Sequence, residues 1–534
     1  MLTPHRLPSW LLRSGLGLGL GLGLGTWTSS ASAQGAADRV RGVVIQRNDV
    51  FEASEARNWA YRLANTLHVE TRPNVIRREL LIEIGDRYDS ALVAESERNL
   101  RALGIFRDVH IDAVPTDTGL VLVVRTADAW TTTFGVNVAA SGGAESTIDL
   151  SLQEGNLLGT RTAAQVAYRN DPDRSSIAAG FDTPRAIGER IGIGASFVER
   201  SDGRGGTASI RRPFLSLSSR NGWSLGSSVF QGRVLQFANG VISDSLWRES
   251  ALLRLDAATA IQADPRGFMR LGLFAQYLRD DQVALEDQDD IPNSRSGTAG
   301  PYLAIRAPRY VRARNVERIG RIEDIDLGVF ANVTLLAAPR AWGYDRNGIG
   351  ASLGAGVGVR LRGLGGFARF GIRGSALQTS EGTDSATAEA ALSLVGQRGE
   401  RHLFVAHASG GVQHNPVPGR EFDLGLGTGL RAYPAHAFTG DRYFVLSSEY
   451  RYLVWPHLFG VVGVGAAAFA GHAGAWNGGD PRLTGTELGL GLRLASIREA
   501  GGIWRLDVSR RAASGSFGAG WVASLGRGFV FGGI

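Results

Sequence analysis

A two-residue alternation of apolar and polar side chains runs through most of the chain after Trp130. Between Tyr443 and Arg451 the odd-numbered positions include Ser447 and Glu449, whereas the even-numbered positions are largely aromatic or aliphatic. The same alternation recurs at residues 134–139, 487–494 and 504–509. Each such segment predicts a β-strand with one apolar and one polar face. Its recurrence over about 400 residues exceeds what a single water-soluble core accommodates and is typical of a transmembrane β-barrel.

The length of this region sets an expected number of strands. In a hydrocarbon environment an open sheet edge would leave backbone N–H and C=O groups unpaired, so the strands must close on themselves. Residues 130–534 are therefore predicted to form an antiparallel transmembrane β-barrel. At roughly 25 residues per strand and connection, this region predicts about 16 strands.

Composition limits how the chain can meet a membrane and which partners it can bind. The mean hydropathy is −0.04, and the sequence contains no run of about 18 apolar residues that would form a spanning helix. The 534 residues contain no cysteine, and every one of the 57 basic residues is arginine. A net charge of +6 is modest for this length and does not indicate a nucleic-acid partner.

The first 33 residues have the features of a signal peptide. Arg6 and Arg13 precede a short apolar run at residues 16–24, and Ala31-Ser32-Ala33 forms a small-residue cleavage site. Cleavage after Ala33 and export are therefore expected. A membrane-anchoring helix is the weaker alternative, because the run is short and rich in glycine.

Residues 39–128 mix helical and strand periods and predict a small α+β domain. An amphipathic helix is expected at residues 54–67, a short helix opens at Pro73, and a third helix begins at Ser90. A hairpin follows, in which Val109, Ile111 and Ala113 alternate with polar residues before the return strand at 120–124.

This region resembles the polypeptide-transport-associated (POTRA) domain that precedes outer-membrane assembly barrels. The resemblance rests on residues 75–80, on Gly85-Asp86, on residues 100–106 and on the hairpin, in that order. The helix at residues 54–67 looks like an insertion into the pattern. The resemblance implies a single POTRA domain in the periplasm, in front of a barrel in the bacterial outer membrane.

A short motif in a predicted loop carries a second resemblance. Leu430-Arg431-Ala432-Tyr433 is similar to the Val-Arg-Gly-Tyr motif of the outer-membrane assembly-factor superfamily, of the BamA and TamA type, which also includes two-partner secretion transporters. In those relatives the loop folds back into the barrel and its arginine meets carboxylates on the inner wall. The resemblance implies this role for Arg431, with Glu449 or Asp507 as the candidate partner. Ala432 replaces the usual glycine, and residues 469–472 lack the aspartate that relatives carry, so a solvated-loop arginine remains the alternative.

The two ends of the barrel sequence are expected to meet at a seam. Ser524, Gly526, Phe529 and Phe531 have the spacing of the terminal-strand signal that barrel-assembly machinery reads. We therefore expect the last strand to pair with the first and the seam between them to open sideways, with glycine lowering the cost of parting. The residues assigned to this lateral seam are Phe134, Val136, Val138, Gly526, Gly528, Phe529 and Phe531.

These features predict an outer-membrane factor that inserts or exports polypeptides by strand templating and lateral opening. The edge strand with Val109, Ile111 and Ala113 would bind an extended client. Expected partners are unfolded outer-membrane or secreted polypeptides and outer-membrane lipid, with periplasmic proteins or lipoproteins as further candidates. No cofactor, metal or enzymatic activity is expected, because the chain has no phosphate-binding lysine, no HExxH helix and no serine nucleophile elbow. The alternative is a passive channel with a partner-binding periplasmic domain.

Overall fold

The computed structural model describes residues 39–51, 59–141, 145–188, 190–238, 240–284, 294–416, 419–425, 429–497 and 503–527. The expected signal peptide lies outside the described residues, as do the seam residues Gly528, Phe529 and Phe531.

The N-terminal region is a small mixed α/β unit that is POTRA-like. Its three-stranded sheet has the order β1-β3-β2, with β1 parallel and β2 antiparallel to β3. Ile76, Leu100 and Val124 are fully buried in its core, where two of the helices cover the sheet. The elements are β1 (Val40–Asn48), α1 (Trp59–Leu67), α2 (Pro73–Arg77), α3 (Ser90–Ala102), β2 (Phe106–Thr116) and β3 (Gly119–Asp128).

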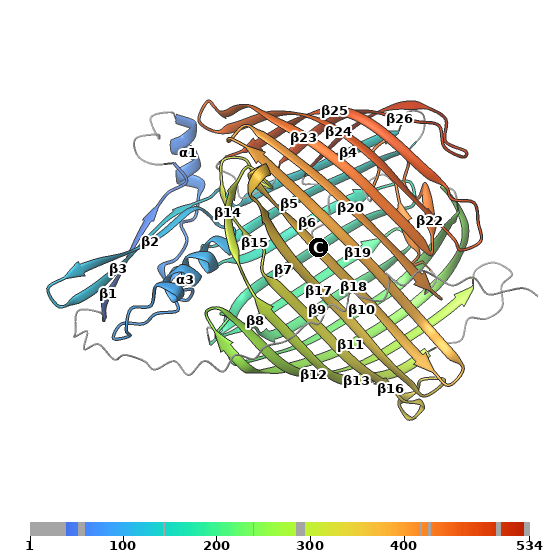
Figure 1. Cartoon of the computed structure of the whole chain (residues 1–534), viewed down its shortest axis with the longest axis horizontal. Coiled ribbons are helices and arrows are strands. Elements are labelled where there is room, and N and C mark those ends of the chain that lie inside the picture. The colour runs from blue at the N-terminus through green and yellow to red at the C-terminus, as the bar shows by residue number, and fades with distance from the viewer. Residues whose placement is uncertain are drawn as a thin grey trace, which may run out of the picture.

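In the described residues, twenty antiparallel strands form one barrel. The α/β unit lies at one end of this barrel, which we call the proximal end, and the opposite end is the distal end (Figure 1). The wall strands are β4 (Thr132–Ser141), β5 (Glu145–Leu157), β6 (Thr162–Asn170), β7 (Ser175–Ile187), β8 (Ile191–Arg200), β9 (Gly203–Arg212), β10 (Asn221–Ala238), β11 (Val241–Asp264), β12 (Gly267–Ala284), β13 (Ser294–Ala307), β16 (Val329–Ala338), β17 (Gly348–Leu361), β18 (Gly366–Thr379), β19 (Gly382–Arg398), β20 (His402–His414), β23 (Arg442–Leu458), β24 (Val462–Trp476), β25 (Thr484–Ser496), β26 (Trp504–Arg511) and β27 (Gly520–Arg527).

The expected number of 16 strands is therefore wrong. Several connections are only two residues long, such as those between β8 and β9 and between β11 and β12. Tight hairpin turns of this kind use far fewer residues than the allowance of roughly 25 per strand and connection assumed. The antiparallel barrel itself is confirmed.

The alternation of the sequence corresponds to the two faces of the wall. On β25 the side chains of Leu488, Leu490 and Leu492 are exposed on the outside, whereas Glu487 and Arg493 are buried on the inside. The outer surface therefore presents aliphatic side chains, and the inner surface carries the charges.

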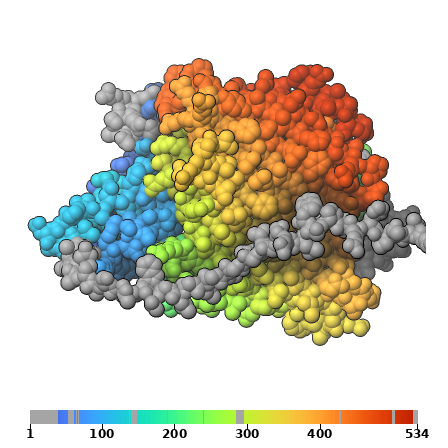
Figure 2. Space-filling view, viewed as in Figure 1, coloured from blue at the N-terminus to red at the C-terminus, as the bar shows by residue number. Residues whose placement is uncertain are grey.

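Two short hairpins lie apart from the wall sheet. The first, β14 (Tyr310–Arg314) and β15 (Ile322–Asp326), connects β13 to β16 at the proximal end, next to the α/β unit (Figure 1). The second, β21 (Phe422–Leu424) and β22 (Phe438–Gly440), belongs to the long connection between β20 and β23 at the distal end. The space-filling view shows the α/β unit seated directly against the proximal end of the barrel (Figure 2).

The barrel closes where β27 pairs with β4. The register covers four positions, from Val522 opposite Ser141 to Leu525 opposite Val138. On its other side β27 pairs with β26 over all eight of its residues. Within the part of the chain that the structure describes, the closure between β27 and β4 is thus shorter than the pairing with β26.

Candidate functional site

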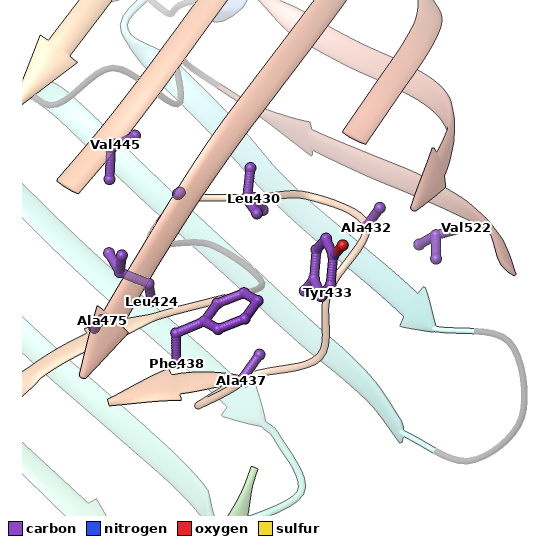
Figure 3. Close-up of a cluster of buried hydrophobic side chains, with 10 residues drawn as sticks. Leu424, Leu430, Ala432, Tyr433, Ala437, Phe438, Val445, Ala475 and Val522 are labelled. Atoms are coloured by element: carbon purple, nitrogen blue, oxygen red, sulfur yellow. The ribbon is translucent and has the colours of Figure 1, made fainter. Parts of the chain in front are cut away.

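The long connection between β20 and β23 folds back into the barrel. Leu430, Tyr433 and Phe438 are fully or almost fully buried and pack against inward-facing Val445 and Ala473 of the wall (Figure 3). A hydrophobic cluster on the inner surface therefore holds the loop in the lumen. Burial of these aromatic and aliphatic groups stabilises the folded-back conformation, because each removes apolar surface from water.

Arg431 extends from this cluster to two strands of the wall. Its guanidinium donates from Nη2 to Glu449 Oε2 and from Nη1 to Asp507 Oδ2, each over 2.9 Å. The same group lies 4.0 Å above the ring of Phe469. Since Glu449 is on β23 and Asp507 on β26, one side chain of the loop connects strands that are not neighbours. The planar fork of arginine suits this arrangement, whereas lysine presents a single point charge.

A second arginine completes the network from the wall itself. Arg493 on β25 donates to both oxygens of Glu449 over 3.0 and 2.7 Å and to Asp507 Oδ1 over 2.6 Å. Arg451 also donates to Glu449. Charges buried this deeply require partners, because an unpaired ion in the interior carries a large desolvation cost. The two carboxylates are therefore shared among several guanidinium groups.

The loop backbone is held as firmly as its arginine. Glu487 accepts a hydrogen bond from the Ala432 amide over 2.7 Å, and the Tyr433 hydroxyl donates to the carbonyl of Ala512 over 2.7 Å. Gly485 lies directly under the Tyr433 ring, where a Cβ atom would approach ring carbon Cζ to 2.5 Å. Glycine on the inner face of β25 thus leaves the space that the loop occupies.

The two departures from the motif have a structural explanation. Ala432 is fully buried within the loop cluster, so its methyl group is accommodated where relatives carry glycine. Phe469 on β24 lies beneath Arg431, and the carboxylates come from β23 and β26 instead.

Sequence reasoning missed three members of the site, Arg451, Glu487 and Arg493. Each is an odd-numbered residue on the inward face of its strand, so the alternation alone could have identified all three. It could not show that they meet, because this depends on the register between strands.

A histidine fixes the distal part of the same loop. His436 lies 2.5 Å from Asp423 on β21 and 2.8 Å from Asp173 in the connection between β6 and β7, and its ring stacks on Phe237. Burial alone would lower the pKa of His436, but hydrogen bonds to Asp173 and Asp423 and their negative charges raise it to about 9. The imidazole is therefore positively charged at neutral pH.

The proximal hairpin enters the barrel from the opposite end. Val316 and Leu327 pack on Phe367 and Leu403 of the inner wall. The Val316 carbonyl accepts a hydrogen bond from Arg451 Nη1 over 3.0 Å, which joins the hairpin to the Arg431 network.

The same hairpin also contacts the α/β unit. Asp324 pairs with Arg101 of α3 over 2.6 Å, and Arg321 donates to the Phe106 carbonyl of β2. A continuous set of polar contacts therefore runs from the distal loop through the lumen to the α/β unit.

The structure places the other predicted residues in two regions. Val109 is buried in the α/β core, while Ile111 and Ala113 pack partly against it. Because β2 pairs only with β3, no described strand covers its other backbone edge.

The seam residues lie on β4 and β27. Phe134 is exposed on the outside, Val136 and Val138 lie further along β4, and Gly526 lies beyond the last paired position of β27. Gly526 is on β27, whereas the other three predicted seam residues that follow it lie outside the described residues.

Two other features, a metal-binding cluster and a membrane-spanning helix, are absent from the described ranges. No group of three or more His, Asp or Glu side chains there could hold a metal ion. None of the helices described is long and apolar enough to cross a membrane.

The described residues thus form a twenty-stranded β-barrel with a buried ionic network in its lumen and an N-terminal α/β unit at one end. The sequence is 32% identical over 134 residues to the outer membrane protein assembly factor BamA of Neorickettsia risticii. The match covers 24% of this chain and 18% of the length of that curated relative. No protein-family model matches the sequence.

Solved structures of similar fold include two barrels of known type. CdiB from Escherichia coli is 11% identical, with a TM-score of 0.47 and coverage of 94% of this chain and 93% of that one. BamA from Haemophilus ducreyi lacking POTRA domains 1–3 is 11% identical, with a TM-score of 0.38 and coverage of 91% and 85%.

Proposed function

We propose that this protein inserts polypeptides into the outer membrane or exports them across it. In this proposal the proximal end of the barrel is periplasmic and the distal end extracellular. The observation that carries the proposal is the attachment of the long loop between β20 and β23, through Arg431, to Glu449 and Asp507 on the inner wall. A buried network of this kind fixes the loop in one position inside the lumen. Under this proposal residues 1–33 are a signal peptide, residues 39–128 a single POTRA domain and residues 130–534 the barrel.

The proposed mechanism is strand templating at β2 followed by lateral opening. The free edge of β2 offers unpaired N–H and C=O groups, and an extended client would add to the sheet there. The client would then reach the seam between β4 and β27, where the described pairing is limited to four positions. Gly526 follows the last of these positions and weakens the strand there. Folding of the client into lipid supplies the free energy, so no nucleotide is needed.

The proposed partners follow from this mechanism. They are unfolded outer-membrane or secreted polypeptides, the lipid around the barrel, and periplasmic proteins or lipoproteins that deliver the client. Nucleic acid is not among them.

The first prediction concerns Arg431→Ala in liposomes. Loss of this guanidinium leaves Glu449 and Asp507 with fewer partners and frees the loop, so we expect insertion of a urea-denatured outer-membrane barrel polypeptide to fall at least about tenfold. Insertion is measured as protease-protected client. Arg431→Lys retains the charge without the fork and is expected to be intermediate.

Arg373→Ala is the matched control for charge in the lumen. Arg373 is 74% exposed and pairs with Glu389 over 2.7 Å, away from the buried network. If Arg431→Ala changes ion conductance while client insertion remains at the level of Arg373→Ala, the protein is a passive channel and the transport proposal fails.

A further inference from the structure

Helix α1 has two opposite faces, and the contacts of its described side chains with the rest of the protein described below come from one of them. Asn65 donates to the Phe51 carbonyl over 2.8 Å and accepts from the Phe51 amide, and Tyr61 stacks on the Phe51 ring with centroids 4.3 Å apart. Trp59 and Leu63 are one turn apart and, at 100° per residue, point away from Tyr61 and Asn65. They are 69% and 48% exposed.

The attached face brings α1 to the rim of the barrel. The Tyr61 hydroxyl donates to the carbonyl of Phe459, in the periplasmic turn between β23 and β24, over 3.1 Å. Phe459 is 82% exposed, and Trp455 near the same end of β23 is also exposed. Exposed aromatic side chains at this level form the belt with which a barrel meets the membrane interface. Figure 1 shows α1 beside the ends of these strands.

The segment that follows α1 reaches a second turn of the rim. The Arg72 amide donates to the Gly159 carbonyl and the Arg72 side chain to the Leu158 carbonyl, each over 3.0 Å. These two residues belong to the turn between β5 and β6. Around the barrel, the ends of β25, β26, β27 and β4 lie between the two turns. Residues 59–72 therefore pass the periplasmic end of the seam.

We propose that α1 binds the periplasmic leaflet of the outer membrane beside the seam, with Trp59 and Leu63 among the lipid acyl chains. The occupant is lipid because the free face of α1 continues the exposed aromatic belt of Trp455 and Phe459. A short amphipathic helix with an aromatic residue on its apolar face is suited to this interface. The inference goes beyond the proposed function, since it holds whether or not a client passes the seam.

The test uses single cysteines in the full-length protein, which has none of its own. Leu63→Cys and, in a separate variant, Trp59→Cys are labelled with an environment-sensitive fluorophore and reconstituted in phosphatidylethanolamine and phosphatidylglycerol vesicles. Some of the lipid carries a quencher on the acyl chain. Leu490→Cys, on the lipid-facing side of β25, is the membrane reference, and Asp117→Cys, in the turn between β2 and β3, is the aqueous reference.

The proposal expects quenching at both α1 positions of at least about half that at position 490. Quenching at both positions as weak as that at position 117 would overturn it and would favour a protein partner for this face. A folded-barrel gel shift shows that each labelled variant is intact. No client is present in this experiment, so weak quenching at both α1 positions would not bear on the proposed function. Likewise, a loss of client insertion in the Arg431 experiment would not bear on whether α1 binds lipid.

Discussion

At the residue scale, the buried carboxylate of Glu449 is the centre of the lumenal network. It accepts hydrogen bonds from Arg431, Arg451 and Arg493 within 3.0 Å. The side chains of Arg493 and Glu449 are each 1% exposed, so losing one of these charges should cost more folding free energy than losing one of a surface pair.

The second prediction compares a buried and an exposed ion pair. Glu449→Gln leaves several buried guanidinium groups short of a counter-charge and should lower the free energy of unfolding by about 3–5 kcal/mol. Glu389→Gln breaks the pair with mostly exposed Arg373 and should cost about 1 kcal/mol or less. Denaturant titration of the detergent-solubilised barrel measures both. If the two variants lost the same free energy of unfolding, burial of the network would add nothing to the stability of the barrel.

The third prediction is a pH dependence that resides in His436. The pKa of His436 in the folded protein is about 9, above the ordinary value of 6.5. The charged imidazole therefore stabilises the folded loop fully below about pH 6.5, and this stabilisation is lost as the pH rises through 9. Protease cleavage of the loop between β20 and β23 should therefore increase between pH 7 and pH 10. His436→Gln removes the titrating group, and its cleavage rate should be high and nearly independent of pH. A wild-type rate that stays constant over this interval would contradict the assignment.

At the element scale, the hairpin β14–β15 occupies the proximal part of the lumen. Its tip packs on β18 and β20 through Val316 and on β23 and β25 through Ile319. Leu327, which directly follows β15, belongs to the same cluster as Val316. The contact with Arg101 adds a restraint from the α/β unit.

The fourth prediction follows from this position. Replacing residues 310–326 with a short Gly-Ser linker should increase single-channel conductance in planar bilayers, because it removes protein from the lumen. Asp324→Ala breaks only the contact with Arg101 and should leave conductance near the wild-type value, since the packing on the inner wall remains. A deletion that leaves conductance unchanged would place the conducting path elsewhere.

The hairpin also shows where sequence reasoning reached its limit. The alternation assigned Glu449 to the inner face and predicted a barrel, since the period of a strand is a local property. Residues 310–326 have a strand-like pattern too, and nothing local distinguishes a strand inside the lumen from one in the wall. The predicted number of strands was wrong for a related reason, because the lengths of the turns are set by tertiary geometry. The meeting of Arg431 with both Glu449 and Asp507 depends on the register of four strands, which the sequence alone does not define.

At the scale of the whole molecule, the described part of the seam between β4 and β27 has four paired positions, and we expect the barrel to part there. The fifth prediction is that a disulfide between Val138→Cys and Leu525→Cys, which are opposite in register, abolishes client insertion and that a reductant restores it. The control pair, Val508→Cys with Ala523→Cys, joins β26 to β27 and should leave insertion intact. Insertion that persists with the seam locked would rule out lateral opening.

The Arg431 network lies entirely on one side of that seam. Every strand that it joins, from β23 to β26, belongs to the C-terminal part of the wall, so separating β27 from β4 would leave each of its carboxylates with the same guanidinium neighbours. The work of parting is then mainly that of exchanging main-chain hydrogen bonds, and the folded-in loop would travel with the C-terminal strands as one rigid piece. His436 and Thr439 are exceptions, because they tie the loop to Asp173 and to Phe237 of β10. A single proton on one imidazole therefore contributes to how tightly the two parts of the cylinder hold together.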